Sequence, residues 1–135
     1  MKQRGRKSAL SVVGGSGVSA IERPQPLPEL TTEQRNEWIQ VVNALPADWF
    51  PAETHGVLAQ YCRHLVTARH VAQMISDMES NKEIDVNEYD KLLKMQERES
   101  RIGVSLATKM RITQQATYDR EKVKGTSKVS RPWED

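Results

Sequence analysis

The sequence has little of the material from which a large hydrophobic core or a disulfide framework is built. Among its 135 residues there is one cysteine, Cys62, and aromatic residues make up only 5% of the chain. A single cysteine excludes an intramolecular disulfide and any zinc module that needs several cysteines. Leu, Ile, Val and Phe together form only about a fifth of the residues, which is near the level at which a chain struggles to fold alone. The composition therefore argues against a large enzyme core and fits a cytosolic protein.

Long hydrophobic runs are also missing. No stretch of 18 apolar residues occurs, so we expect no membrane-spanning segment and no membrane partner. The N-terminal residues 1–7 are basic but lack the apolar stretch that a secretory signal has after its charged start, so we do not expect such a signal.

Charge is unevenly distributed. Residues 1–23 and 113–131 carry an excess of Lys and Arg, whereas residues 24–112 carry 10 basic and 13 acidic side chains. Basic segments commonly bind phosphate backbones, because the counterions that they displace drive association. An extended Arg4-Gly5-Arg6 can enter a narrow minor groove. We therefore take the basic residues of the two ends as candidate DNA-binding residues: Lys2, Arg4, Arg6, Lys7, Lys122, Lys124, Lys128 and Arg131.

The chain divides into three parts. Residues 1–30 contain Gly14-Gly15-Ser16-Gly17 and then three prolines between 24 and 28, which is typical of a flexible linker rather than of packed structure. Residues 31–122 should form a helical core that mediates oligomerisation, and the polar residues 123–135 a flexible tail.

The expected fold is all-α, a long antiparallel helical hairpin with a short helix at each end. The first helix should begin after Thr31, which forms a capping-box pattern with Gln34, and end before Pro46. A second helix over about 52–80 and a third over about 87–112 form the hairpin, and Gly103 suggests a close helix crossing. A fourth helix should run over about 114–122 and begin after Thr113. Heptad-like spacing predicts a seam along the second helix: Leu58, Tyr61, Leu65, Ala68, Ala72 and Ile75. The residues expected in the core or in subunit contacts are Leu58, Tyr61, Leu65, Ile75, Leu92 and Leu106.

The sequence contains no recognisable catalytic or cofactor-binding motif. The glycines at 14–17 are not followed by the Lys-Ser/Thr of a phosphate-binding loop. His55, His64 and His70 do not have the spacing of a helical metal pair, and we expect them at interfaces or on the surface. The carboxylates of residues 83–90 suit a helix start better than a metal site. We therefore predict a protein that is not an enzyme and that has no cofactor and no metal.

The amount of core material also predicts assembly. Two antiparallel rods bury one stripe each and leave their other apolar side chains in water. Small folds with too little core usually gain stability by oligomerising. We therefore expect subunits that meet through their hairpin faces.

The order of these features resembles the small subunit of the terminases of tailed bacteriophages. The resemblance covers most of the chain: Arg4-Gly5-Arg6-Lys7 with a proline-rich lead-in, the stretch from Trp38 to Leu45, Leu58-Ala59-Gln60-Tyr61-Cys62, Leu92-Leu93, and residues 103–118. Met110-Arg111-Ile112-Thr113-Gln114-Gln115 is similar to the Leu-x-Leu-Thr-Pro junction of the family. The chain departs from the family in having Gln114 where Pro is common, and in lacking Asn-Pro before the third helix.

The resemblance implies a ring-forming, non-enzymatic factor for viral genome packaging in the cytoplasm of an infected bacterial host. Its partners would be double-stranded viral DNA, other copies of itself, and the terminase large subunit, whose ATPase and nuclease activities it modulates. The hairpin, about 51–112, would build the ring, and Pro132 and Trp133 in the C-terminal segment would bind the large subunit. Two alternatives stay open: a coiled-coil scaffold or adaptor that does not bind nucleic acid, and a helix-turn-helix regulator. The length of the two central helices argues against the second alternative.

Overall fold

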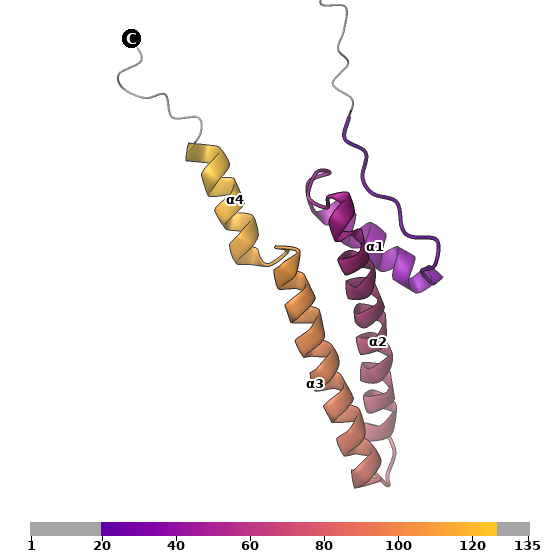
Figure 1. Ribbon diagram of the computed structural model, residues 1–135. Coiled ribbons are helices and arrows are strands. Elements are labelled where there is room, and N and C mark those ends of the chain that lie inside the picture. Colours follow the sequence, from indigo (N-terminus) through magenta and orange to yellow (C-terminus); the bar gives the residue numbers. More distant parts are fainter. Residues whose placement is uncertain (1–19, 127–135) are drawn as a thin grey trace, which may run out of the picture.

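A computed structural model describes residues 20–126 of the chain, and every regular element in this range is a helix (Figure 1). In chain order these are α1 (Thr32–Ala44), a short 3-10 helix η2 (Ala52–Thr54), α2 (His55–Glu79), α3 (Val86–Lys109) and α4 (Gln114–Thr126). The prediction of an all-helical chain with a long hairpin is confirmed for this range. The predicted tails at residues 1–19 and 127–135 lie outside the described residues.

The first helix begins and ends as its sequence predicts. The Thr31 hydroxyl accepts a hydrogen bond from the Gln34 amide at 3.3 Å, and the Thr31 amide donates to the Gln34 side chain at 3.1 Å. This capping box satisfies backbone donors that a helix start leaves free. The helix ends at Ala44, because Leu45 precedes a proline and takes an extended conformation.

The helix α2 is central, and both α1 and α3 pack against it (Figure 1). At one end of the molecule, α1, the following loop and the first half of α2 enclose a small core, in which Trp38, Leu58 and Cys62 are completely buried. At the other end a short turn connects α2 to α3. Asp85 caps α3 there by accepting hydrogen bonds from the amides of Asn87 and Glu88.

The proline-rich lead-in is packed, contrary to our prediction that residues 1–30 are linker. Leu30 is 4% exposed, and the Trp38 indole donates a hydrogen bond to the Pro24 carbonyl at 2.9 Å. The Arg35 guanidinium donates to the carbonyls of Leu30 and Pro28. Extended proline-rich backbone makes no internal hydrogen bonds, so its carbonyls are available to donors from a neighbouring helix. Residues 23–30 therefore pack along α1 as part of the helical core, and we call this segment the strap.

The predicted heptad seam of α2 is wrong in part. Ala72 is exposed, whereas its neighbour Val71 is only 2% exposed. The face of α2 that meets α3 includes His64, which contacts Glu99 of α3. Val71 is seven residues further on, so helical geometry places it on the same side of α2. A second face, with Leu58 and Cys62, belongs to the core shared with α1. The apolar residues of α2 thus form two stripes, because the helix has partners on two sides.

Two helix ends and one expected contact also differ from prediction. The third helix ends at Lys109 rather than near 112, because Arg111 takes a left-handed backbone conformation with φ 57°. The fourth helix continues to Thr126, beyond the predicted end at 122. Its start is as expected, since the Thr113 hydroxyl accepts from the Ala116 amide. A Cβ placed on Gly103 would have no neighbour within 4 Å, so this glycine does not mark a close helix crossing.

Candidate functional site

The most unusual feature of the described chain is the long helix α3, which has no fully buried residue. Its inner side packs on α2 with half-buried side chains that include Leu92 and Leu106. On another side, Val86, Leu93 and Val104 are 74%, 39% and 67% exposed. These three follow one another at intervals of two and three helical turns, and so form one line that we call the outer apolar strip. Because these three side chains lie on one side of a helix that has no fully buried residue, we take the strip as a candidate protein–protein interface.

The hairpin is loosely closed in the half that lies away from its connecting turn. Figure 1 shows α2 and α3 close together at their connecting turn and further apart towards α4. A groove of about 360 Å³ lies between them, lined by Tyr61, Leu65 and Ala68 from α2 and by Gly103 from α3 among others. At this groove His64 Nδ1 lies 2.5 Å from a carboxylate oxygen of Glu99 and links the two helices. Of the predicted core or interface residues, Leu58 and Ile75 are buried, and Tyr61, Leu65, Leu92 and Leu106 are half-buried.

A second candidate site lies at the junction of α3 and α4. The amides of Arg111 and Ile112 donate back to the carbonyls of Thr108 and Ala107, which is the hydrogen-bond pattern of a Schellman helix end. The loop between α1 and α2 approaches this turn, and the Trp49 indole donates to the Met110 carbonyl at 3.0 Å. The junction is therefore fixed by a residue 61 positions earlier in the chain.

The same loop holds α4. The Arg120 guanidinium lies 4.6 Å from the centre of the Trp49 ring, and it donates to both Asp48 carboxylate oxygens at 3.1 and 3.0 Å. Arginine is well suited to combine stacking on an aromatic face with an ion pair to a carboxylate. A pocket of about 600 Å³ lies beside these residues, lined also by Met110, Arg111 and Val123.

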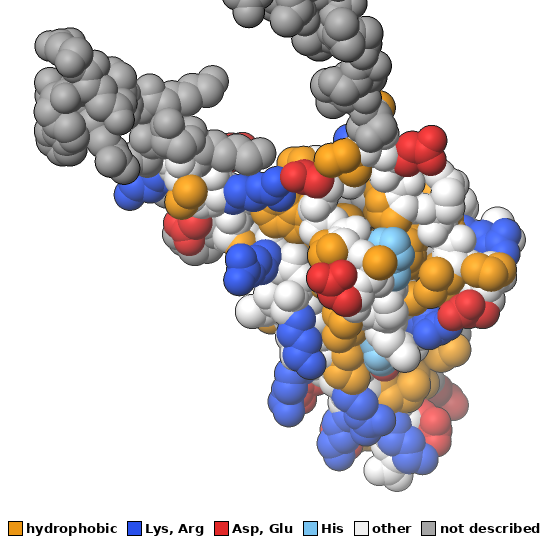
Figure 2. All heavy atoms as spheres, turned by 45° about the horizontal axis from the view of Figure 1, so that its top comes forward, with side chains coloured by type: hydrophobic (Ala, Val, Ile, Leu, Met, Phe, Trp, Pro, Cys, Tyr) orange, Lys and Arg blue, Asp and Glu red, His pale blue; other side chains and the backbone are white. Residues whose placement is uncertain are grey.

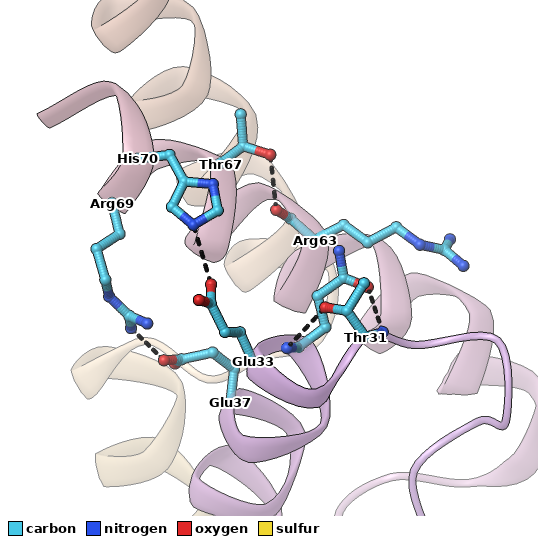
Figure 3. A network of polar contacts seen from close by, with 8 residues as sticks. Thr31, Glu33, Glu37, Arg63, Thr67, Arg69 and His70 are labelled. Carbon is cyan, nitrogen blue, oxygen red and sulfur yellow. Dashed lines mark hydrogen bonds and ion pairs between the residues drawn. The ribbon is translucent and has the colours of Figure 1, made fainter. Parts of the chain in front are cut away.

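On the solvent side of the contact between α1 and α2, ion pairs join the two helices. Figure 3 shows Arg69 and His70 of α2 reaching Glu37 and Glu33 of α1. Glu37 is only 9% exposed, and its hydrogen bond raises the pKa of Arg69. A buried carboxylate needs such a partner. This network holds α1 against α2, so each of its charged groups has a structural role.

All three histidines contact other parts of the fold, and the cysteine is buried in the core. His55 contacts the Phe50 carbonyl at 3.1 Å and the edge of Trp38, while His64 and His70 face carboxylates of α3 and α1. Burial, and after it the nearby Glu37 carboxylate, raise the pKa of the Cys62 thiol to about 12. Because the thiolate is the reactive form, Cys62 is poorly suited to nucleophilic chemistry. Within residues 20–126 no three His, Cys, Asp or Glu side chains are grouped to hold a metal ion.

Most predicted DNA-binding and partner-binding residues belong to the two terminal segments. Lys2, Arg4, Arg6, Lys7, Lys128, Arg131, Pro132 and Trp133 lie outside the described residues. Lys122 is exposed on α4, and Lys124 lies on the same helix with a side chain that is not described. The structure does not bring these basic residues together into one described surface.

Sequence reasoning missed the junction between Trp49, Arg120 and the end of α3. No local pattern connects Trp49 with residues 110 and 120, which lie more than sixty positions further along the chain. The helix end at Arg111 lacks the glycine that usually marks such a turn. The sequence offers one weak signal for this junction, which is an aromatic residue in a tight loop together with a distant arginine.

Comparisons with protein-family models, with curated proteins and with solved structures found no match to this chain. In the part of the chain that the structure describes, no helix is both long enough and apolar enough to cross a membrane.

Proposed function

We propose that this protein is a DNA-packaging factor of the terminase small-subunit kind, a non-enzymatic ring that binds viral double-stranded DNA and engages the large subunit. The observation that carries the proposal is the outer apolar strip of α3 on a helix that has no fully buried residue. Together with the resemblance of the sequence, it supports a protein whose fold is completed by further copies of itself.

Assembly in this proposal proceeds through the hairpin. A strip with Val86 and Val104 each about 70% exposed gains from burial roughly 25 cal/mol for each Å² of apolar surface removed from water. The hairpin turn and α4 lie at opposite ends of α3, so neighbouring hairpins can pack side by side along its length (Figure 1). Repetition of one such contact around an axis produces a closed ring.

DNA binding is proposed for the two basic ends of the chain, which we call the arms; the C-terminal arm includes Lys122 and Lys124 of α4. The arms would contact phosphates without reading bases, and Arg4-Gly5-Arg6 would enter the minor groove. Replacing Arg4, Arg6 and Lys7 by Ala should weaken binding of a duplex and flatten its dependence on salt. An unchanged salt slope would remove the N-terminal arm from the proposal.

Docking of the large subunit is proposed for the C-terminal segment that contains Pro132 and Trp133. Tryptophan frequently dominates the energy of an interface. Deleting residues 131–135 should abolish stimulation of the large subunit's ATPase while leaving assembly intact. Stimulation equal to that of the full chain would exclude this segment as the docking element.

The decisive experiment combines native mass spectrometry with a gel shift over a salt series. A single closed copy number together with salt-dependent binding of duplex DNA supports the packaging factor. A defined oligomer that ignores DNA supports the alternative of a scaffold or adaptor. A folded monomer at micromolar concentration contradicts the assembly on which the proposal depends.

A further inference from the structure

The solvent side of α3 carries a line of basic residues. At about 100° per residue, its five Lys and Arg side chains fall within an arc of roughly 80°. All of them are exposed, and they extend over about 27 Å of helix. We call this line the basic stripe: Lys91, Lys94, Arg98, Arg101 and Lys109.

The stripe does not coincide with the surfaces that pack the fold. By the same helical geometry it points away from the half-buried residues Leu92 and Leu106 that lie towards α2, and it is offset from the outer apolar strip. Figure 2 shows Lys and Arg side chains following one another along one edge of the molecule. Contacts through the apolar strip therefore leave the basic stripe accessible.

The carboxylates near the stripe form only weak, exposed ion pairs with its side chains. Lys91 pairs with Glu88 at 3.0 Å, Lys94 with Asp90 at 2.7 Å, and Arg101 with Glu97. The side chains of these pairs are 55–78% exposed, and exposed pairs along one helix contribute little to stability. Glu99 does not face the stripe, because it turns inward to His64. Phosphates can therefore replace the carboxylates at small cost.

We propose that the basic stripe binds the phosphate backbone of duplex DNA without sequence preference. This inference rests on the proposed function and adds to it a binding surface on the folded core. A straight stripe of about 27 Å matches the axial length of about eight base pairs. The stripe carries no aromatic side chain, whereas surfaces for single strands combine charge with aromatic residues on which bases stack. The arrangement therefore favours a duplex over a single strand.

The test is fluorescence anisotropy of a labelled 30-base-pair duplex with the full-length chain over a salt series. Replacing Lys91, Lys94, Arg98 and Arg101 by Gln should weaken binding at least tenfold at 0.1 M salt. It should also reduce the slope of log K against log salt by about 0.9 for each phosphate that the variant no longer neutralises, thus by about 2–4 in total. Circular dichroism and sedimentation check that each variant keeps its helices and its assembly.

A matched pair of variants separates position from net charge. The double variant Lys94→Gln, Arg98→Gln and the double variant Arg63→Gln, Lys82→Gln remove the same charge, but Arg63 and Lys82 lie off α3 on α2 and the hairpin turn. Only the first should lower the salt slope, by about 2. In the opposite direction, Glu97→Gln should tighten binding a few-fold by releasing Arg101, whereas Glu83→Gln should not.

The outcomes distinguish this inference from the function on which it rests. If the unmodified chain does not bind the duplex, the proposed function fails and the stripe fails with it. If the unmodified chain binds but both double variants behave alike, the inference is overturned while binding by the ends of the chain stands. Stronger competition by a single strand than by an unlabelled duplex overturns it as well.

Discussion

At the residue scale, Arg111 is the one described non-glycine residue with a positive φ angle. A side chain in the left-handed conformation costs roughly 1–2 kcal/mol, and glycine is the usual residue at this position of a Schellman helix end. Met110 and Ile112 on either side of it pack into or against the core, so the turn cannot relax without exposing those side chains. The strain at Arg111 is thus held in place by its neighbours.

Replacing Arg111 by Gly should raise the free energy of unfolding by about 0.5–1 kcal/mol. The gain is smaller than the full strain, because glycine also has more freedom in the unfolded chain. Urea denaturation at one fixed protein concentration measures it. Ser105→Gly, at an exposed position inside α3, is the control and should lower stability by about 0.5 kcal/mol. Equal losses in the two variants would contradict a strained Arg111.

The buried thiol of Cys62 predicts a pH dependence of stability. Burial raises its pKa from 9.0 to about 12, so the folded state holds the thiol proton more tightly than the unfolded state does. Stability from this group is complete below pH 9 and falls as the pH rises above 9. Urea denaturation should therefore show a larger loss between pH 8 and pH 10 in the unmodified chain than in Cys62→Ala.

The comparison with Cys62→Ala isolates the thiol. The pKa of Tyr61 is raised as well, mainly by burial, but its phenol is present in both proteins. The larger part of its shift, which burial causes, is therefore common to both, and only the smaller part that the Cys62 thiolate causes is lost in Cys62→Ala. If the two stability curves run parallel between pH 8 and pH 10, the thiol does not have the raised pKa.

At the scale of elements, α4 depends on a loop rather than on a helix face. Its described anchor is Arg120, which stacks on Trp49 and pairs with Asp48, while Trp49 also donates to the end of α3. Side chains of one short loop thus set the direction in which α4 leaves the hairpin. An isolated helix of 13 residues is only marginally stable in water, so α4 needs these contacts.

Replacing Trp49 by Ala should release α4 while leaving the hairpin folded. The variant lacks the ring under Arg120 and the donor to Met110, and we expect stability to fall by about 2 kcal/mol. Hydrogen exchange should show the α4 amides exchanging at least tenfold faster, with the α2 amides near Cys62 much less affected. Trp49→Phe keeps a ring without the donor and should give an intermediate result. Unchanged protection of α4 would contradict this account.

At the scale of the whole molecule, the hairpin leaves several large apolar side chains of α3 exposed. The described core is concentrated where α1, the following loop and α2 meet, whereas α3 contributes only half-buried side chains to the hairpin. The proposed assembly completes the core at the level of the oligomer, because the outer apolar strip is left without a partner within the chain's described residues.

Replacing Val104 by Glu should therefore disrupt assembly without unfolding the subunit. Val104 is 67% exposed, so the substitution should change the stability of the single chain by no more than about 0.5 kcal/mol. In an interface the same carboxylate would be desolvated without a partner. Analytical ultracentrifugation should show smaller species for Val104→Glu, whereas Ser105→Glu, which adds the same charge to the basic side of α3, should leave assembly intact. If Val104→Glu sediments as the unmodified chain does, the strip is not the interface.

Local chemistry explains what could be predicted. Helix starts at Thr31, Asp85 and Thr113 depend on side chains that bond amides two or three residues away, so short patterns suffice to find them. The extents of α1 and of the hairpin likewise follow from proline positions and from the spacing of apolar residues. The sequence by itself therefore determined an all-helical chain with a long hairpin and little material for a hydrophobic core.

Long-range contacts decided the rest. Periodicity could not separate the two apolar stripes of α2, because a helix between two partners is apolar on both sides. The predicted seam therefore included the exposed Ala72 rather than the buried Val71. Residues 23–30 look like linker by composition, yet Trp38 and Arg35 needed acceptors that only this strap provides. The turn at Arg111 and the position of α4 depend on Trp49, which is distant in sequence and close in space. Only the tertiary structure brings such groups together, since their mutual stabilisation does not exist until the chain has folded.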